Sequence, residues 1–119
     1  MTPSKLGQTI KAFMADGRDL DLYDEIYAFD AVSVEPFDFG VGRECHGRSA
    51  IREKKRWIME NFVKNALEVE GPYCHGDDRF IMIYRADTTD AMLDARDTIT
   101  VLGLYHIGHG QIVREEFFF

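Results

Sequence analysis

The sequence predicts a single α+β domain in which three helices precede a meander of four antiparallel strands. Apolar residues recur at helical spacing up to about residue 62 and alternate with a period of two beyond it. Short turns separate the later segments and favour antiparallel pairing, because parallel strands need longer crossovers. The 119 residues are enough for one domain, residues 1–119, with one core.

The composition supplies material for a core and describes an acidic chain. Apolar residues make up 45%, including nine Phe, five Tyr and one Trp, which argues against disorder. The net charge of −7 argues against nucleic acid or an anionic membrane surface as a partner. Residues 16–38 hold eight acidic residues and one arginine, and therefore the whole acidic excess.

No apolar stretch is long enough to span a membrane, and the first residues lack a charged-then-apolar signal. We therefore expect a cytoplasmic protein. Two cysteines, Cys45 and Cys74, are too few for a disulfide framework, so free thiols are expected in that compartment.

The first helix is expected to start at Thr2-Pro3, a capping residue followed by an imino acid suited to the first helical position. Its apolar stripe runs from Leu6 to Met14, and Asp16-Gly17 ends it. A second helix is predicted over residues 18–28, with most of its acidic residues on a solvated face.

A short strand over residues 31–35 is expected next, because Val32 and Val34 favour extended structure and Pro36 ends it. A glycine-rich loop follows over residues 37–47, and the third helix over residues 49–62. That helix has a basic face that we expect to be solvated, made of Arg52, Lys54, Lys55 and Arg56.

The meander strands are expected over residues 66–70, 79–86, 93–107 and 111–119, with turns at 74–78, 87–90 and 108–110. Both faces of these strands are apolar, whereas a sheet with one solvated face would alternate apolar with polar residues. We therefore expect the helices to cover one face and a second copy of the chain to cover the other, as a homodimer.

Five motifs follow one another along the chain: Asp19-Leu20-Asp21, Tyr27-Ala28-Phe29-Asp30-Ala31, Glu35-Pro36, Gly47-Arg48-Ser49-Ala50-Ile51-Arg52 and Gly110-Gln111-Ile112-Val113-Arg114-Glu115. In this order the chain resembles the nuclear transport factor 2-like superfamily, and within it the SnoaL-like group, which includes polyketide cyclases and lies near ketosteroid isomerase. The resemblance covers nearly the whole chain. It implies a cone in which a curved antiparallel sheet wraps around three helices, leaving an apolar pocket, usually in a homodimer.

Glu35 is the first candidate catalytic residue, because steroid isomerases of this superfamily carry their general base at the position before Pro36. A partly desolvated carboxylate is suited to proton abstraction. The alternative is an exposed strand-end glutamate, or one paired with a cation at the pocket rim. The isomerase's two oxyanion donors fall near Lys11 and Gly103, neither of which is a Tyr or an Asp, so ketosteroid isomerase activity itself is not expected.

Glu115 is the second candidate. It shares one side of the last strand with Phe117 and Phe119, and the superfamily pattern turns that side toward the pocket. Two carboxylates facing each other would separate into acid and base roles. The favoured alternative is a cross-strand pair between Glu115 and a cation such as Arg96.

In a cone, core and pocket wall are one surface, so aromatic and apolar side chains of this surface are candidate ligand contacts and equally candidate core. They are Tyr23, Tyr27, Trp57, Phe80, Met82, Tyr84, Val101, Tyr105, Phe117 and Phe119. Among them the tyrosines are possible hydroxyl donors whose direction the sequence does not define.

A metal site was the weaker alternative for the two Cys-His-Gly tripeptides at 45–47 and 74–76 and for the pair His106 and His109. Adjacent residues of an extended chain point in opposite directions, so each tripeptide offers one ligand, and no metal is expected. The sequence thus predicts an isomerase-, cyclase- or lyase-type enzyme without metal or organic cofactor, acting on a hydrophobic or cyclic molecule. A noncatalytic ligand-binding or protein-interaction module is the alternative.

Overall fold

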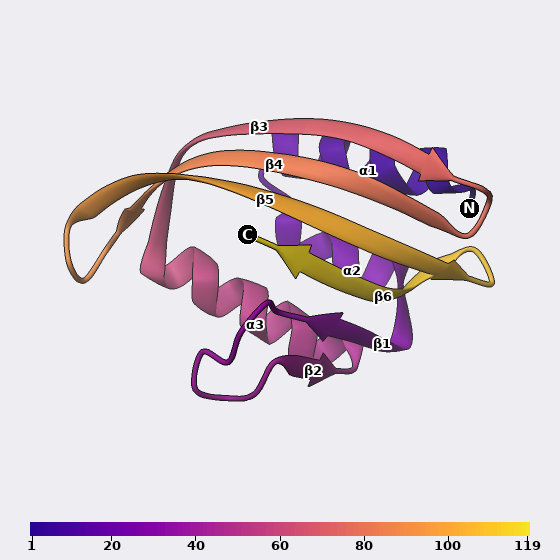
Figure 1. The fold of residues 1–119 in the computed structure, drawn as a ribbon, viewed down its shortest axis with the longest axis horizontal. Coiled ribbons are helices and arrows are strands. Elements are labelled where there is room, and N and C mark those ends of the chain that lie inside the picture. Colours follow the sequence, from indigo (N-terminus) through magenta and orange to yellow (C-terminus); the bar gives the residue numbers. More distant parts are fainter.

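The computed structural model describes residues 1–119, in which helices cover one face of a curved sheet (Figure 1). The helices are α1 (Pro3–Ala15), α2 (Leu22–Ile26) and α3 (Arg48–Asn61), with a 3-10 turn, η1 (Asp19–Asp21), before α2. The strands are β1 (Tyr27–Val34), β2 (Glu44–His46), β3 (Phe62–His75), β4 (Arg79–Asp90), β5 (Ala95–Gly108) and β6 (Gln111–Phe118). The predicted α+β class, with three helices inside a curved sheet, is confirmed.

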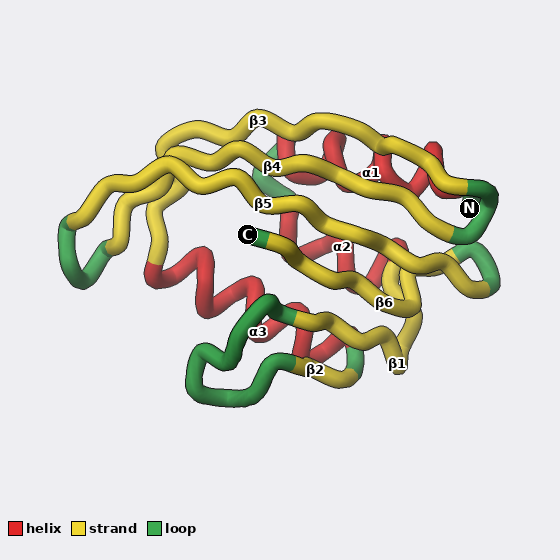
Figure 2. The backbone as a smooth tube through the Cα atoms, viewed as in Figure 1, coloured by secondary structure: helices red, strands yellow, loops and turns green.

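All six strands form one open sheet in the order β2-β1-β6-β5-β4-β3, traced in Figure 2. The predicted antiparallel meander is its β3–β6 part. The sheet as a whole is mixed rather than purely antiparallel, because β1 runs parallel to β6. A parallel pair needs a long connection, and α3 with the meander provides one.

The predicted second helix is wrong over its last residues. A helix over 18–28 was expected, but the chain turns through η1 and α2 and is already extended at Tyr27, where β1 begins. Pairing with β6 explains the difference, because Tyr27 lies opposite Ile112 and tertiary contacts override a weak local preference. The predicted loop 37–47 likewise contains β2, which pairs with β1.

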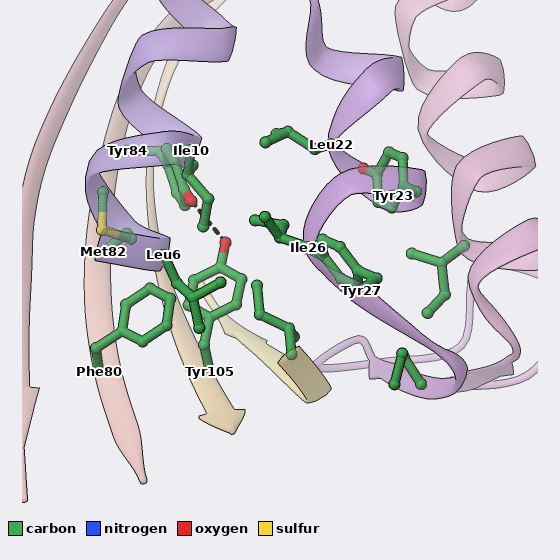
Figure 3. Packing of buried hydrophobic residues seen from close by; sticks show 14 residues of the cluster. Leu6, Ile10, Leu22, Tyr23, Ile26, Tyr27, Phe80, Met82, Tyr84 and Tyr105 are labelled. Atoms are coloured by element: carbon green, nitrogen blue, oxygen red, sulfur yellow. Dashed lines mark hydrogen bonds between the residues drawn. The ribbon is translucent and has the colours of Figure 1, made fainter. Parts of the chain in front are cut away.

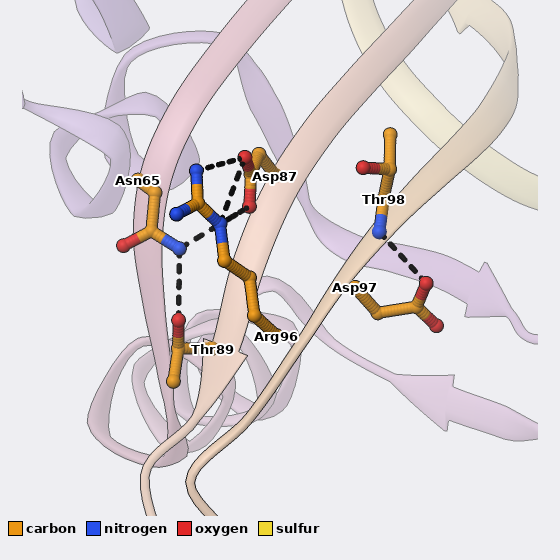
Figure 4. Close-up of polar contacts among 6 residues, drawn as sticks. All are labelled: Asn65, Asp87, Thr89, Arg96, Asp97 and Thr98. Carbon is orange, nitrogen blue, oxygen red and sulfur yellow. Dashed lines mark hydrogen bonds and ion pairs between the residues drawn. The ribbon is translucent and has the colours of Figure 1, made fainter.

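The first two meander strands, β3 and β4, are longer than predicted. Residues 87–90, expected to form a turn, belong to β4, and the hairpin turn lies beyond Asp90. Figure 4 shows how polar side chains hold these strand ends: Asn65 donates to Thr89 at 2.8 Å, and Arg96 Nη2 donates to Asp87 at 2.7 Å. A run of polar residues therefore marks a solvated strand end here and not a turn.

The core lies between α1, α2 and the concave face of the sheet (Figure 3). Leu6 and Ile10 of the predicted α1 stripe are fully buried, and Thr2 caps the helix by accepting from the Lys5 amide, as expected. From the sheet, Phe80 and Met82 of β4 fill the same space. Each such side chain contributes roughly 1.5–3 kcal/mol by leaving water.

None of the helices combines the length and the apolar character that crossing a membrane would require.

Cys45 and Cys74 are unpaired thiols, as expected, and burial raises the pKa of Cys45.

Gly7 brings α1 into direct contact with β3, because a Cβ at this position would collide with the Pro72 ring. We expect Gly7→Ala to lower the free energy of unfolding by roughly 1–3 kcal/mol, since overpacking outweighs the gain in helix propensity. Urea denaturation measures this. Lys5→Ala, at an exposed position of the same helix, is the control and should stay within about 0.5 kcal/mol. A stabilised Gly7→Ala variant would contradict the close contact.

Candidate functional site

The interior of the domain holds one buried acidic side chain on β6, Glu115, which is 2% exposed. It stands where two strand pairings meet, opposite Ser33 in the parallel β1–β6 pair and opposite Tyr105 in the antiparallel β5–β6 pair. The inward direction that the superfamily resemblance implies for Glu115 is the one observed. A carboxylate removed from water requires donors for its oxygens.

Strand β1 supplies those donors. The Tyr27 hydroxyl donates to Oε1 of Glu115, and the Ser33 hydroxyl donates to Oε2 at 2.7 Å. Both donors are themselves buried, at the two ends of the inward side of β1. The expected pairing of Glu115 with Arg96 is wrong, because Arg96 lies on the far end of β5 and binds Asp87. Polar contacts of Glu115 are thus made within the core, by hydroxyl groups.

Lys54 of α3 connects this carboxyl to the edge of the domain. Its Nζ donates to the Ser33 hydroxyl at 2.5 Å and to Oε1 of Glu35 at 2.8 Å. The Lys54 ammonium also lies 5.6 Å from the centre of the Phe117 ring. A continuous path of hydrogen bonds therefore runs from Glu35 through Lys54 and Ser33 to Glu115.

Opposing effects act on the pKa of the buried Glu115 carboxyl. Burial raises the pKa of its carboxyl, and the nearby Glu35 charge acts in the same direction. The Tyr27 hydrogen bond, the Lys54 charge and the Ser33 hydrogen bond oppose that rise. Burial prevails, so the pKa of Glu115 lies above its ordinary value, and a carboxyl with a raised pKa is suited both to accept and to return a proton.

Glu35 occupies a different environment. Its carboxylate is paired with Lys54, with side-chain exposures of 12% and 22%, respectively. The geometry is thus the alternative considered for Glu35, a carboxylate paired with a cation near the rim. An ion-paired carboxylate is less available as a base than one whose partners are neutral hydroxyls.

Figure 3 shows four buried tyrosines in the core, of which Tyr27 is hydrogen-bonded to Glu115. The rings of Tyr23 and Tyr27 lie 4.8 Å apart, and the hydroxyls of Tyr84 and Tyr105 are 2.5 Å apart. Burial raises the pKa of each of these four phenols, with the Glu115 charge as a further cause, so all four remain protonated donors at neutral pH.

The remaining candidate contact residues differ in how deeply they are buried. Phe80 and Met82 are fully buried core, whereas Val101 and Phe117 are partly buried against it. Trp57 is 57% exposed on α3 and packs on Phe62, away from Glu115, and Phe119 joins an exposed aromatic cluster with Phe37 and Phe39. 

Two of the six cavities of the molecule are lined by residues other than the buried carboxyl and its hydrogen-bond partners. One of about 610 Å³ is lined by Phe29, His46 and the start of α3, and another of about 190 Å³ by Phe80, Ile81 and Leu104. Neither is lined by Glu35 or Glu115. The buried hydrophobic cluster, which includes Tyr27 and Tyr105, lies on the same concave side of the sheet as Glu115.

The two Cys-His-Gly tripeptides lie far apart in the sheet. Cys45-His46 is on β2 and Cys74-His75 is on β3, the two opposite edge strands. His106, on β5, lies 3.5 Å from Glu116 instead. The tripeptides therefore do not converge on one site.

A second buried carboxylate, Asp19, lies at the junction between η1 and α3. Its Oδ2 lies 3.6 Å from Lys55 and 4.0 Å from Lys64, while Oδ1 has no partner. Together with the Lys54–Glu35 pair and the Arg48–Asp24 contact at 3.8 Å, this pairing shows that the basic side of α3 faces the acidic segment 16–38. The expectation of solvated faces is wrong for Asp19, Lys54 and Lys55, whereas Asp24, whose side chain is 76% exposed, is solvated as expected.

Ser33 and Lys54 are functional candidates that the sequence reasoning missed. A signal for Ser33 exists, because it continues the inward positions of β1 after the buried Ala31, where small residues allow a close approach. Lys54 has no such signal. It is one of several bases on α3, and only the folded chain distinguishes it.

Comparison with known proteins agrees with this architecture. The SnoaL-like domain family matches residues 1–119. Among solved structures, a Mesorhizobium loti protein that carries the name of a SnoaL-like polyketide cyclase is 28% identical, with a TM-score of 0.91 and 100% of both chains covered. Among curated proteins, none matches the chain.

Two more distant structures share the fold. A nuclear transport factor 2-like protein of Burkholderia pseudomallei is 17% identical over 100% of this chain and 92% of its own, with a TM-score of 0.80. TerC, co-crystallised with polyporic acid, is 17% identical over 98% of this chain and 91% of its own, with a TM-score of 0.73. Because the family match spans every residue, the chain belongs to the SnoaL-like domain family and has the nuclear transport factor 2-like fold.

Proposed function

We propose that the chain binds a hydrophobic or cyclic small molecule in the interior of its cone and moves a proton on it, as an isomerase, cyclase or lyase, with Glu115 as the acid–base group. One observation carries this proposal. Glu115 is a buried carboxyl with a raised pKa whose hydrogen bonds come from neutral hydroxyls, and Ser33 links it to Lys54 at the rim. Groups with these properties are suited to general acid–base catalysis.

The proposed reaction moves a proton from one carbon of the ligand to another atom of the same ligand. Glu115 accepts the proton from carbon through one carboxylate oxygen, and the electron pair of the C–H bond stays on the ligand. Tyr27 and Ser33 hold the carboxyl in place by hydrogen bonding to its oxygens. The protonated carboxyl then returns the proton to a second atom. Lys54, held by Glu35, keeps the Ser33 hydroxyl directed at Glu115.

Names among the similar structures support a small-molecule ligand. TerC was co-crystallised with polyporic acid, and the Mesorhizobium loti protein carries a polyketide cyclase name. Both point to cyclic compounds rich in oxygen as the class from which a ligand of this chain is drawn.

A noncatalytic binding or interaction module is the second candidate. The observation in its favour is the packing of the interior, where apolar side chains surround Glu115 and the two surface cavities lie elsewhere. In that case the Glu115 network is a device that fixes the pairing of β1 with β6.

Deuterium uptake by an enolisable cyclic ketone, 2-tetralone, distinguishes the two candidates. We expect the wild-type protein to accelerate exchange at the carbon beside the carbonyl, and Glu115→Gln to reduce the rate about 100-fold or more, because an amide cannot accept the proton. Proton NMR in D₂O measures the rate.

Two further variants show whether Glu115 or another carboxylate is the base. Glu35→Gln should reduce exchange less than tenfold if Glu35 only holds Lys54, whereas a loss as large as that of Glu115→Gln would assign the base to Glu35. Glu116→Gln, on the outer side of the same strand, should change nothing. Absence of exchange in the wild type would favour the noncatalytic module.

The raised pKa of Glu115 also predicts a pH dependence of stability. Between the unfolded value of about 4.5 and the raised folded value, the folded state retains a proton that the unfolded state releases. Stability therefore falls as the pH rises through this window. The free energy of unfolding of wild type minus that of Glu115→Gln should decrease from pH 4.5 upward, as measured by urea denaturation.

Glu116→Gln is the matched control for that measurement. Its hydrogen bond with Arg114 holds the pKa of Glu116 below the ordinary value, so its contribution to stability is complete above pH 4.5 and is lost only at lower pH. The difference between wild type and Glu116→Gln should then be flat above pH 4.5. A flat or rising difference for Glu115→Gln would contradict the raised pKa.

The outer sheet face remains the proposed site of homodimerisation. Ile81, Ile83, Leu102 and Leu104 are only partly covered there, and one of the two cavities lies among them. An apolar face of this kind is stabilised by a second copy. We expect a dimer by sedimentation at micromolar concentration, a monomer for Ile83→Glu, and an unchanged dimer for the α1 control Lys5→Glu. A wild-type monomer would exclude this dimer.

A further inference from the structure

Tyr84 on β4 and Tyr105 on β5 form a pair of buried phenols that takes no part in the hydrogen bonds of Glu115. Their hydroxyl oxygens lie 2.5 Å apart, drawn as the dashed line in Figure 3. In the sheet Tyr105 is opposite Phe80 and Tyr84 is opposite Val101, so the two residues are not cross-strand partners. The Tyr105 ring, stacked on Phe80 with ring centres 4.8 Å apart, must lean along its strand to reach Tyr84.

Gly103 makes this arrangement possible. A Cβ at position 103 would lie 2.9 Å from Cε2 and 3.0 Å from the hydroxyl of Tyr105, closer than side chains pack. The ring therefore occupies the space that any other residue at 103 would take. The chain thus places a hydroxyl, carried by Tyr105, over a position that has no side chain of its own.

One hydroxyl proton of this tyrosine pair has no acceptor. Two phenols carry two hydroxyl protons, and the bond between them uses one. The other proton belongs to whichever hydroxyl accepts that bond, and no second acceptor lies within hydrogen-bond distance of either oxygen. Tyr84 and Tyr105 are 8% and 2% exposed, so water does not readily supply the acceptor. A buried donor without an acceptor is costly, and where one persists in a native structure a catalytic role or a bound water or ion can account for it.

The tyrosine pair lies next to Glu115, the proposed base. Tyr105 is the cross-strand partner of Glu115, and both point to the concave side of the sheet. A donor beside a base is the arrangement that removal of a proton next to a carbonyl requires. The C–H bond electrons move toward the carbonyl carbon, its π electrons move onto oxygen, and the proton goes to the carboxylate, so an enolate oxygen forms where a donor is needed.

We infer that Tyr84 and Tyr105 form an oxygen-binding site that donates one hydrogen bond to a carbonyl oxygen of the ligand, and to the enolate oxygen formed from it. The inference rests on the proposed function and narrows its substrate class to carbonyl compounds. It assigns the oxyanion donor that neither Lys11 nor Gly103 can supply, through residues of two central strands.

The test uses two probes of similar shape, 2-acetylnaphthalene, whose carbonyl accepts hydrogen bonds, and 2-ethylnaphthalene, which has no oxygen. Fluorescence titration should give the acetyl compound about tenfold tighter binding to the wild-type protein, and its carbonyl stretch should shift to lower frequency on binding. Since either tyrosine alone still carries a free proton, Tyr84→Phe and Tyr105→Phe should each retain the preference within about threefold. The double variant should lose both the preference and the frequency shift.

Controls separate this inference from the role of Glu115. Tyr73→Phe removes an exposed tyrosine on β3 and should leave the preference unchanged. Glu115→Gln should also retain it, because the preference reports a hydrogen bond to the carbonyl oxygen and not removal of a proton from the methyl group. Loss of deuterium exchange with a retained preference would therefore separate the base from the donor site. Equal binding of the two probes, no binding of either, or a preference that survives in the double variant would overturn the inference. If the double variant does not fold, the frequency shift in the wild type and in the two single variants decides alone, and its absence in the wild type overturns the inference.

Discussion

The burial of the Glu115 carboxyl is the constraint on which the arrangement of this domain depends. Removing an ionisable group from water costs several kcal/mol unless donors replace the water. Those donors come from β1, so β1 must lie beside β6 in one register, with Ser33 opposite Glu115. The Ser33 hydroxyl accepts from Lys54 in turn, which places α3 over the junction of the two strands. The hydrogen-bond network around this one buried acid thus connects β1, α3 and β6, three elements from separate parts of the sequence.

The acidic excess has a structural explanation in the same helix. Residues 16–38 carry the net charge of the chain, and α3 carries a cluster of basic residues. Asp19 with Lys55, Glu35 with Lys54 and Asp24 with Arg48 join the two segments. The first two pairs are partly shielded from solvent, where attraction is less screened than at the surface. Opposite charge therefore contributes to holding α3 against the first third of the chain, together with the packing of the fully buried Ile51.

Much of the fold follows from local pattern, and the site follows from it only in part. The Leu6–Ile10 stripe predicts α1, and the alternation after residue 62 predicts the meander. Alternation alone does not say which side of β6 faces inward, and the superfamily resemblance implies that it is the side of Glu115. Periodicity reports which side of an element is buried but not which other element covers it. The parallel pairing of β1 with β6 and the choice of Lys54 among the bases of α3 depend on contacts between distant segments. The sequence reasoning therefore identified Glu115 but paired it with Arg96 instead of with Ser33 and Tyr27.

The parallel β1–β6 pair also determines when the candidate site comes into existence. Its groups come from β1, α3 and β6, so a nascent chain in which β6 has not yet emerged contains Tyr27, Ser33 and Lys54 without the carboxylate that they surround. Before that strand docks, β1 has only the three-residue β2 as a partner, and its other edge is open to pairing with any extended segment. During synthesis the inner edge of β1 therefore remains an open strand edge until β6 docks, and open edges of this kind are prone to pairing with other chains.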